Sequence, residues 1–379
     1  MPTRSGTSIL GVASAALILG VTLGARQGAE DLSMFSALPF AAPAPVDNPT
    51  TPDRVALGRL LFWDPILSGS GDIACATCHH PSQAYADGRD LPIGTGGQGI
   101  GPARRFRGTP PIVKRNSPTV LNAAFNGLVA VGGSADPVTA PMFWDMRARG
   151  LEAQALGPIE SAEEMRGTRV EAGKGVAAAV ERIGRVREYE QLFTKAFGEP
   201  DAVNQRNLAK AIAAFERTLI TPDSPFDRYM RGDKTAMKAT AVVGMAMFRD
   251  GGCIGCHKGP MFSDFQPHVL GVNDHPSLRE PDTGIDGHDA FRTPSLRNVN
   301  LTAPYMHNGR VVYLSEAVGF YQRPGPNLRV PRSEIDPLLN RVNVRAALWE
   351  VIDFLMALEG TFDRTVPKRV PSGLKPGGQ

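Results

Sequence analysis

Apolar residues recur at the spacing of amphipathic helices in five stretches of the chain, residues 53–62, 171–197, 204–219, 234–248 and 344–358. The apolar stripe is clearest in the third and fifth stretches, where it comprises Leu208, Ile212, Phe215 and Leu219, and then Val344, Leu348, Val351, Ile352 and Leu355. Side chains three or four residues apart lie on one face of an α-helix, so each stripe predicts a helix that buries one side. The pattern predicts a mainly α protein with few or no strands.

Proline and glycine lie mostly between these stretches, and their number, 32 and 41 among 379 residues, predicts long, shaped loops. One such loop covers residues 80–114, and a glycine- and aspartate-rich loop ends at Asp289. The proline-rich residues 221–225 are the natural boundary between two units. We therefore expect two domains, residues 53–220 and 221–365, each with an opening helix, a long loop and a closing helix. An apolar content of 42% is enough to give each domain a core.

The two ends of the chain differ from the rest. Arg4 precedes an uncharged run over residues 9–23, which has the length of a signal-peptide core and is short for a membrane span. No clean cleavage site is evident, so residues 1–29 are either a signal peptide or an uncleaved N-terminal anchor, and we expect a periplasmic protein that contacts a membrane only in the second case. Residues 30–52 predict a flexible lead-in, and residues 366–379 a flexible tail.

The four cysteines of the chain all belong to two copies of the motif Cys-x-x-Cys-His, which are Cys75, Cys78 and His79, and Cys253, Cys256 and His257. This motif attaches c-type haem, because two thiols add to the porphyrin vinyl groups and the histidine ligates the iron. Cysteines three residues apart on one helical turn reach both vinyl groups, and the next residue points at the metal. The alternative, a zinc site of four cysteines, normally has a short spacer between the pairs and does not explain a histidine after each pair. We predict two covalent haem c groups in two cytochrome c-like domains, with no cysteine left for a disulfide.

With two such motifs on this plan, the chain resembles the bacterial di-haem cytochrome c peroxidase family, including its MauG-like branch. The likeness extends over residues 56–358 and rests on the segments ALGRLLFWDPILSGSGDIACATCH, RNSPTVLN, FWDMR and FRTPSLRNVNLTAPYMHNG, and on the closing helix. The resemblance implies that peroxide reacts at the N-terminal haem and that the C-terminal haem handles electrons.

The resemblance also suggests catalytic residues. Trp144 of FWDMR matches the family tryptophan between the two haems, where a π-system carries an electron or hole; the alternative is an ordinary core tryptophan. Gln154 and Glu164 follow at the spacings of the family's distal pocket. A positioned carboxylate can move a proton from the bound oxygen of peroxide to the departing one, so Glu164 is the candidate, with Gln154 as a hydrogen-bond partner. In one alternative, the catalytic carboxylate is Glu163, one residue earlier. In the other, these glutamates are only the solvent-exposed acidic residues that often begin a helix.

Two features depart from the usual pattern of the family. Members that need reductive activation carry a histidine on the loop after the first haem motif, but residues 83–113 contain none, so we expect an open first haem in the isolated protein. At the position of the sixth ligand of the C-terminal haem, where other members have methionine, this chain has Tyr321, as MauG-like proteins do. A phenolate favours higher iron oxidation states and lowers the potential. In the alternative, Met306 is the ligand and Tyr321 is a packed aromatic.

The resemblance implies a calcium ion between the domains, held by the Asn116 side chain and by the carbonyl groups of Thr302 and Pro304, since Ca²⁺ prefers oxygen donors. The same segments also have purely structural uses as loops. Four more histidines are expected to form loop hydrogen bonds or haem propionate contacts, namely His268, His275, His288 and His307. Arg292 and Arg297 are candidates for propionate pairing or are ordinary surface arginines.

Three functions follow. The first is a periplasmic peroxidase that reduces hydrogen peroxide to water at the N-terminal haem, with electrons from a small cytochrome c or cupredoxin relayed through the C-terminal haem. The second is a MauG-like oxidase that uses a bis-Fe(IV) state to oxidise residues of a partner protein. The third is a non-catalytic di-haem electron-transfer protein. A net charge of +3 with 21% charged residues does not suggest a nucleic-acid partner.

Overall fold

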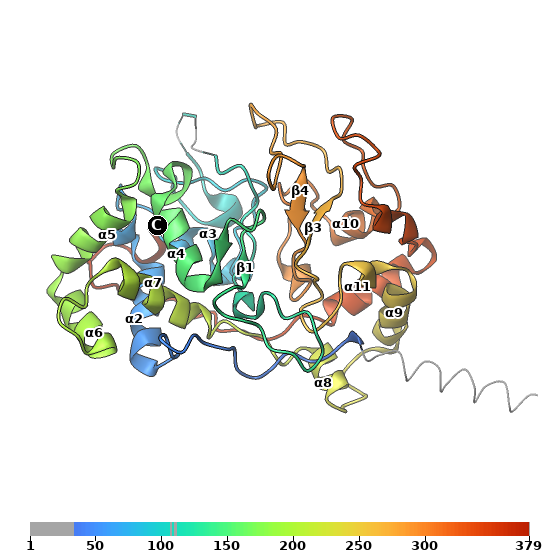
Figure 1. Cartoon of the computed structure of the whole chain (residues 1–379), viewed down its shortest axis with the longest axis horizontal. Helices are drawn as coiled ribbons and strands as arrows, with labels where there is room; N and C mark the ends of the chain where they lie inside the picture. The colour runs from blue at the N-terminus through green and yellow to red at the C-terminus, as the bar shows by residue number, and fades with distance from the viewer. Residues whose placement is uncertain (1–33, 107, 110–111, 379) are drawn as a thin grey trace, which may run out of the picture.

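A computed structural model describes residues 34–106, 108–109 and 112–378. The described chain forms two halves that lie side by side, with most of residues 52–220 in one half and most later residues in the other (Figure 1). Its helices are α2 Pro52–Trp63, α3 Cys75–Cys78, α4 Gly150–Glu160, α5 Gly175–Gly184, α6 Arg187–Phe197, α7 Gln205–Glu216, α8 Pro225–Met230, α9 Ala239–Asp250, α10 Leu314–Phe320 and α11 Leu348–Met356. The prediction of a mainly α fold is confirmed.

The N-terminal half is built around α2 and α7. The Thr51 side chain caps α2 by accepting a hydrogen bond from the Arg54 amide. Proline suits the first helical position, Pro52, because an N–H group at that position would have no partner within the helix. The two helices cross closely, since a Cβ on Gly58 would lie 1.8 Å from the Ala211 carbonyl oxygen. Their apolar faces, with those of α5 and α6, bury a core that includes Leu61, Ile183, Tyr189, Phe193 and Leu208.

The C-terminal half has the same kind of centre in α9 and α11. A Cβ on Gly244 of α9 would lie 1.7 Å from the Glu350 carbonyl oxygen of α11, so only glycine permits this approach. Aromatic rings fill the core beside the two helices and meet mostly edge to face, as their quadrupoles favour; they are Phe35, Phe226, Phe248, Phe262 and Phe354.

Three predicted helices differ from expectation, and one of them, predicted to begin at residue 234, begins only at Ala239 of α9. The stretch 171–197 forms two helices, α5 and α6, because the chain turns at Arg185 and Val186 and both helices then bury their faces in one core. Gly184, a weak helix former, lies at this turn. The last predicted helix begins at Leu348 rather than at residue 344, after a short 3₁₀ turn.

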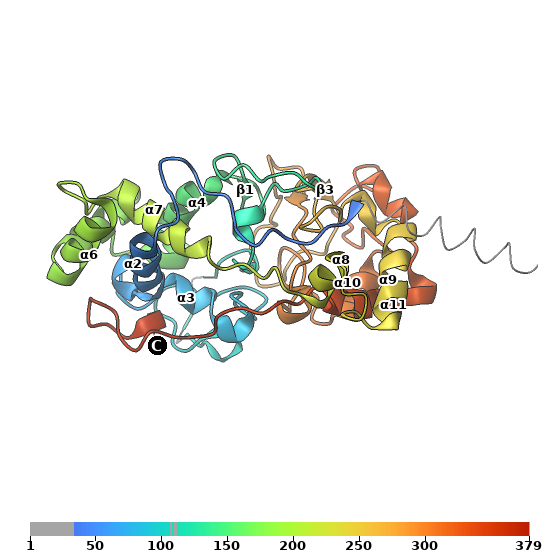
Figure 2. The ribbon, with the colours of Figure 1, turned by 90° about the horizontal axis from the view of Figure 1, so that it is seen from below.

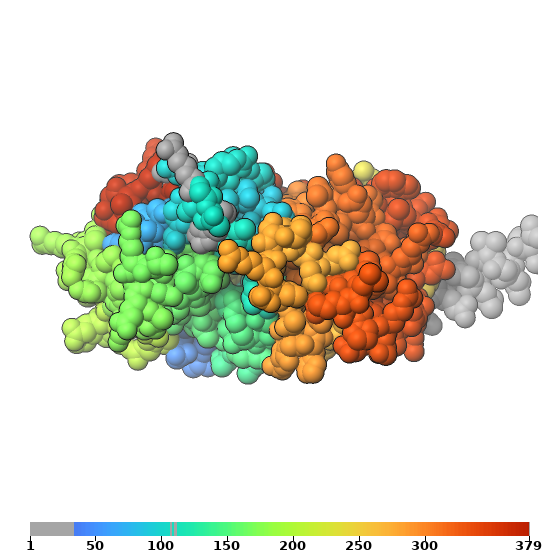
Figure 3. Space-filling model, turned by 90° about the horizontal axis from the view of Figure 1, so that it is seen from above, coloured from blue at the N-terminus to red at the C-terminus, as the bar shows by residue number. Residues whose placement is uncertain are grey.

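Strands are few, as predicted. β1 Pro141–Met142 pairs with β2 Ala148–Arg149, and β3 Pro267–Val269 pairs with β4 Ala290–Arg292, both antiparallel. Each is a short ribbon at the junction of the two halves (Figure 1). The two halves are in contact along a wide interface, to which loops of both halves contribute (Figure 3). The two ribbons, β1–β2 and β3–β4, therefore position the loops that connect their strands at this interface.

The lead-in and the tail, which the sequence predicts as flexible, pack against the rest of the protein in their described parts. Phe35 of the lead-in is 1% exposed and lies in the core of the C-terminal half. The tail runs back under the N-terminal half (Figure 2), where Val370 is 1% exposed and Thr77 donates to the Gly377 carbonyl at 2.7 Å. Apolar side chains in both segments cause this packing, because their burial is favourable. Each terminal segment thus contacts the half to which it is not adjacent in sequence.

The predicted signal peptide or anchor, residues 1–29, lies outside the described residues. Within the part of the chain that the structure describes, no helix is both long and apolar enough to cross a membrane.

Candidate haem sites and the junction between them

The first Cys-x-x-Cys-His motif lies on the single turn α3, after which His79 is held by its backbone. The Nδ1 atom of His79 lies 3.0 Å from the Tyr85 carbonyl oxygen, and burial lowers the pKa of His79. A neutral imidazole that donates from Nδ1 keeps the Nε2 lone pair for a metal. The Nε2 atom of His79 is therefore the ring nitrogen that a metal could bind.

The second motif repeats this geometry. His257 follows a 3₁₀ turn, Cys253–Gly255, and its Nδ1 lies 2.8 Å from the Phe262 carbonyl oxygen. Burial lowers the pKa of His257 as well. Tyr85 and Phe262 both have positive φ, at 57° and 52°, a region that bulky residues rarely adopt and that here places each carbonyl beside its histidine.

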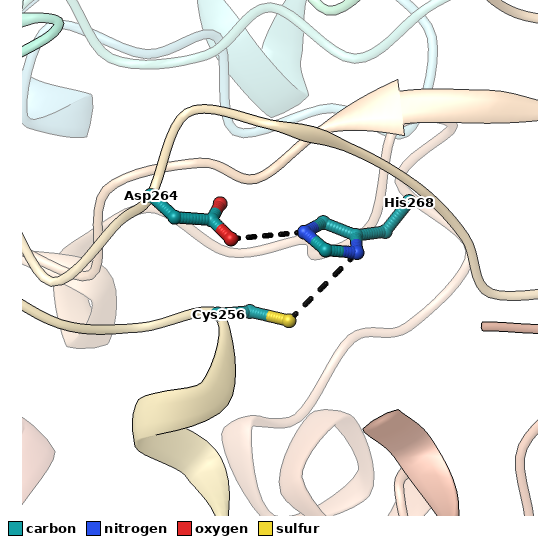
Figure 4. Close-up of side chains that lie close together, drawn as sticks. All are labelled: Cys256, Asp264 and His268. Atoms are coloured by element: carbon teal, nitrogen blue, oxygen red, sulfur yellow. Dashed lines mark hydrogen bonds and ion pairs between the residues drawn. The ribbon is translucent and has the colours of Figure 1, made fainter. Parts of the chain in front are cut away.

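The two cysteine pairs belong to different halves, since Cys75 and Cys78 pack on the N-terminal core and Cys253 on the C-terminal core. This separation does not fit a four-cysteine zinc site. Among the described residues, the one group of three side chains close enough to hold a metal ion is Cys256, Asp264 and His268. Figure 4 shows one ring nitrogen of His268 facing Asp264 and the other facing Cys256. Nε2 lies 3.0 Å from Asp264 and Nδ1 lies 2.5 Å from Asp336, so both ring nitrogens are already engaged by carboxylates.

A large cavity opens beside the second motif and is lined by Cys253, Cys256 and His257. Its walls are mostly apolar, from helices α9, α10 and α11 and from the loops around them, as a porphyrin requires. Tyr321 and Met306, the two candidates for the sixth ligand, both line this cavity. Burial raises the pKa of the Tyr321 phenol.

Glu164 lies near the first motif, on a π-helical turn, Ala162–Arg166, that begins at Ser161. Burial is the main cause of the raised pKa of the Cys75 and Cys78 thiols, and the charge of Glu164 contributes at both. Burial also raises the pKa of Glu164 itself.

The neighbouring Glu163 is exposed and accepts a hydrogen bond from the Ser161 hydroxyl at 3.3 Å. The turn thus directs Glu164, and not Glu163, towards the haem motif. Gln154 is half-buried on α4, the helix that leads into this turn.

The loop after the first motif is held by Arg104, a residue that the sequence presents as one of several loop arginines. Its guanidinium is fully buried and donates to the carbonyl groups of Ile93, Gly94 and Gly99 at 2.7, 2.7 and 3.0 Å. The basic residue in a glycine-rich loop was the only signal for this role in the sequence.

Trp144 lies at the junction of the halves. Its indole Nε1 donates to the Asn116 carbonyl at 2.9 Å, and its own carbonyl accepts from the Arg292 amide of β4 at 2.8 Å. It also lines the cavity of the second motif. Trp144 is therefore a junction residue rather than an ordinary core tryptophan of one half.

The candidate calcium ligands Asn116, Thr302 and Pro304 all line the same cavity. The Asn116 side chain donates from Nδ2 to the Arg89 carbonyl at 2.8 Å, so Oδ1 is the side-chain atom that could accept or bind a cation. Oxygen donors of this kind suit Ca²⁺.

The remaining histidines form structural contacts. His307 stacks on Phe291 at 3.7 Å, and burial lowers its pKa to about 4. His275 lies 3.1 Å from Asp90 of the other half. His288 is exposed on a loop.

The two arginines are not surface residues, because Arg292 is 7% and Arg297 2% exposed. Arg297 pairs with Asp227 at 2.9 Å, so its charge is already balanced within the protein.

Three comparisons with known proteins agree with this geometry. A family model described as "Di-haem cytochrome c peroxidase" matches residues 52–235. The methylamine utilization protein MauG of Methylophilus methylotrophus is 36% identical over 290 residues, which cover 75% of this chain and 76% of that protein. The cytochrome c551 peroxidase of Pseudomonas aeruginosa is 36% identical over 299 residues, or 76% of each chain. Among solved structures, a MauG-like protein associated with microbial copper homeostasis has a TM-score of 0.67 at 25% identity, and the alignment covers 85% of this chain and 95% of that one.

Proposed function

Because the chain belongs to the di-haem cytochrome c peroxidase family, we propose that it reduces hydrogen peroxide to water at the N-terminal haem, with electrons relayed through the C-terminal haem. Membership makes the protein a peroxidase-type oxidoreductase with two haem c groups. The reaction takes up two electrons and two protons for each peroxide and releases two molecules of water. The observation that carries the proposal is that Glu164 is half-buried on the turn after α4 whereas the adjacent Glu163 is exposed, and that the charge of Glu164 acts on both cysteines of the first motif.

Cys75, Cys78 and His79 would hold the first haem, and Cys253, Cys256 and His257 the second. When bound, the first haem supplies an iron atom to which peroxide can bind. The Nδ1 contacts of both histidines support this assignment, since they direct each Nε2 towards a metal.

The Glu164 carboxylate would take the proton from the near oxygen of peroxide and return it to the departing oxygen. Burial favours this role, because a raised pKa brings the carboxyl group closer to the pH at which it can both accept and donate a proton. Gln154 would orient Glu164 or the peroxide by a hydrogen bond.

Trp144 would carry electrons between the two haems. Its position supports this role, because it contacts the N-terminal half through Asn116 and the C-terminal half through Arg292. The electron donor would be a small cytochrome c or cupredoxin that binds at the C-terminal half.

A second candidate function is a MauG-like oxidase that draws electrons from residues of a partner protein. The position of Tyr321 on the cavity wall with His257 favours it, since a phenolate ligand stabilises oxidised iron. A relative named MauG at 36% identity supports it further.

We also propose a calcium ion held by Asn116, Thr302 and Pro304, and export of the chain to the periplasm. The presence of all three residues on the wall of one cavity supports the calcium site.

The test is rapid mixing of the purified ferric protein with hydrogen peroxide, after two haems per chain have been established by pyridine haemochrome assay. We expect prompt spectral change without prior reduction and catalytic peroxide loss when a reduced cytochrome c or cupredoxin is added. Peroxide loss that depends on no added donor, with oxidation of a partner protein instead, would favour the second function. A protein with two haems that does not react with peroxide would contradict both.

A further inference from the structure

Arg292 has a buried positive charge that no acidic residue of the described chain balances. The side chain is 7% exposed, its Nε donates to the Phe143 carbonyl at 2.9 Å, and its Nη1 lies 3.3 Å from the Thr293 carbonyl oxygen. Burial is the sole cause of the lowered pKa of Arg292, at about 10, so no charged group nearby compensates it. A buried cation without a counter-charge costs free energy, and proteins pair such groups.

Three other deeply buried arginines of the described chain are satisfied, and a fourth, Arg217, has its charge balanced by Glu152 although its Nε and Nη1 make no hydrogen bond. Arg297 pairs with Asp227 at 2.9 Å, Arg115 pairs with Asp282 at 2.5 Å, and Arg104 donates to three carbonyl groups. Arg292 differs because it lines the cavity of the second haem motif without an acidic partner, and none of the described residues accepts from its Nη2.

The acidic residues on the cavity wall are already paired with other arginines. Asp274, Asp282 and Asp289 line the cavity. Asp282 binds Arg115, whereas Asp274 and Asp289 both bind Arg329, at 2.9 and 2.7 Å. The missing counter-charge of Arg292 must therefore come from a group that occupies the cavity.

We propose that Arg292 binds a propionate carboxylate of the haem attached at Cys253 and Cys256. A haem carries two propionates, and a guanidinium is the side chain best suited to bind a carboxylate through two donors. The inference rests on the proposed attachment of that haem. It assigns a carboxylate-binding site to the end of β4.

The same residue also fixes Trp144. The Arg292 amide donates to the Trp144 carbonyl at 2.8 Å, while its Nε donates to the carbonyl of Phe143, the residue before it. If a propionate bound the remaining guanidinium nitrogens, Arg292 would link the second haem to the backbone carbonyl groups of Phe143 and Trp144. Arg292 is thus a positioning residue that holds the haem and Trp144 in a fixed relation.

The experiment compares the reduction potential of the second haem in the wild type, Arg292→Gln and Arg292→Lys, by spectroelectrochemical titration without peroxide. Loss of the cation beside the propionate stabilises the ferric state of the haem. We therefore expect Arg292→Gln to lower the equilibrium constant for reduction at least tenfold, which lowers the reduction potential by 59 mV for one electron. Arg292→Lys keeps the charge and should restore most of the shift. Arg345→Gln is the control, because it removes the same charge from an exposed position next to the cavity-lining Val344, where solvent screens it.

A potential in Arg292→Gln that matches the wild type, or a shift no larger than that of Arg345→Gln, would overturn the proposal. If Arg292→Gln does not fold, a crystal structure of the haem-loaded wild type decides the question. A propionate oxygen within hydrogen-bond distance of the Arg292 guanidinium supports the proposal, and two propionates bound elsewhere refute it. Failure of the proposed function has a different signature, namely a haem count below two or no reaction with peroxide in the wild type.

Discussion

Arg115 and Asp282 form a two-point ion pair across the junction of the two halves, with Nε 2.5 Å from Oδ2 and Nη2 2.8 Å from Oδ1. Arg115 also contacts Asp145 at 2.5 Å, and both of its partners are largely buried. Trp144 donates a hydrogen bond to the Asn116 carbonyl; Arg115 immediately precedes Asn116, and Asp145 immediately follows Trp144. The ion pair between Arg115 and Asp145 therefore holds the backbone on both sides of that hydrogen bond. The junction is fixed by charge as well as by packing.

Replacement of Asp282 by Asn should destabilise the protein by about 3 kcal/mol, because it removes one partner of a buried ion pair. The measurement is urea unfolding at pH 7. Glu181→Gln is the control, since it breaks the exposed pair of Glu181 with Arg185 and should cost much less. If both variants lost the same amount of unfolding free energy, the buried pair at the junction would stabilise the protein no more than an exposed pair does.

The same pair predicts a pH dependence. Burial opposes the charged form of Asp282, but the hydrogen bond and the charge of Arg115, together with a bond from the Gly284 amide, outweigh it and keep the pKa of Asp282 below its usual value. A carboxyl group with a lowered pKa stabilises the folded state above its unfolded-state pKa of about 3.9 and loses this effect as the pH falls through the folded-state value. The difference in unfolding free energy between wild type and Asp282→Asn should therefore shrink below about pH 4, and a constant difference would contradict the assignment.

Replacement of Glu164 by Gln should slow the reaction with peroxide by about 10²–10⁴-fold, because a proton-transferring carboxylate contributes this much to a rate. Both haems should stay attached. Glu163→Gln is the matched control, since Glu163 is exposed one residue earlier, and it should react like the wild type. Stopped-flow absorbance measures both rates, and a slow Glu163 variant beside a fast Glu164 variant would reverse the assignment.

Replacement of Tyr321 by Phe should change the visible and EPR spectra of the second haem, because the sixth iron ligand would be lost. Met306→Leu tests the alternative ligand, since Met306 lines the same cavity. Tyr305→Phe, also on the cavity wall, is the control for loss of a phenol. An unchanged spectrum in Tyr321→Phe together with a changed one in Met306→Leu would make Met306 the ligand.

Removal of calcium should loosen the junction. We expect about one Ca²⁺ per chain by elemental analysis of the wild type, because Asn116, Thr302 and Pro304 supply one set of oxygen donors. Asn116→Ala should lose the metal and react more slowly with peroxide, and added Ca²⁺ should not restore it. A calcium-free wild type with full activity would argue against the site.

Deletion of residues 366–379 should destabilise the N-terminal half. The deletion removes the buried Val370, which contributes about 2 kcal/mol if fully buried, and the Ser372 hydroxyl that donates to Asp64 at 2.6 Å. Thermal unfolding measures the loss. Leu374→Ala is a control within the tail because this side chain is 39% exposed and should matter little.

Much of the fold was predictable because helices follow local periodicity. The stripes of residues 53–62 and 204–219 correspond to α2 and α7, and few strands form. The break between α5 and α6 was not predictable, since it depends on how both helices reach one core. The packing of Phe35 and Val370 was missed for the same kind of reason, because a proline-rich composition does not show where a distant core accepts an apolar side chain.

The chemistry of this protein can be read from the chain alone, since the two Cys-x-x-Cys-His motifs are local and their spacing specifies haem attachment. The neighbouring groups that serve this chemistry are known only from the folded protein. Glu164 and Glu163 are adjacent in sequence, and the π-helical turn separates them by direction. Arg292 and Arg297 look alike in sequence, but Asp227 lies beside only one of them. Charge pairing and burial depend on residues far apart in the chain, and these become neighbours only when the whole chain has folded.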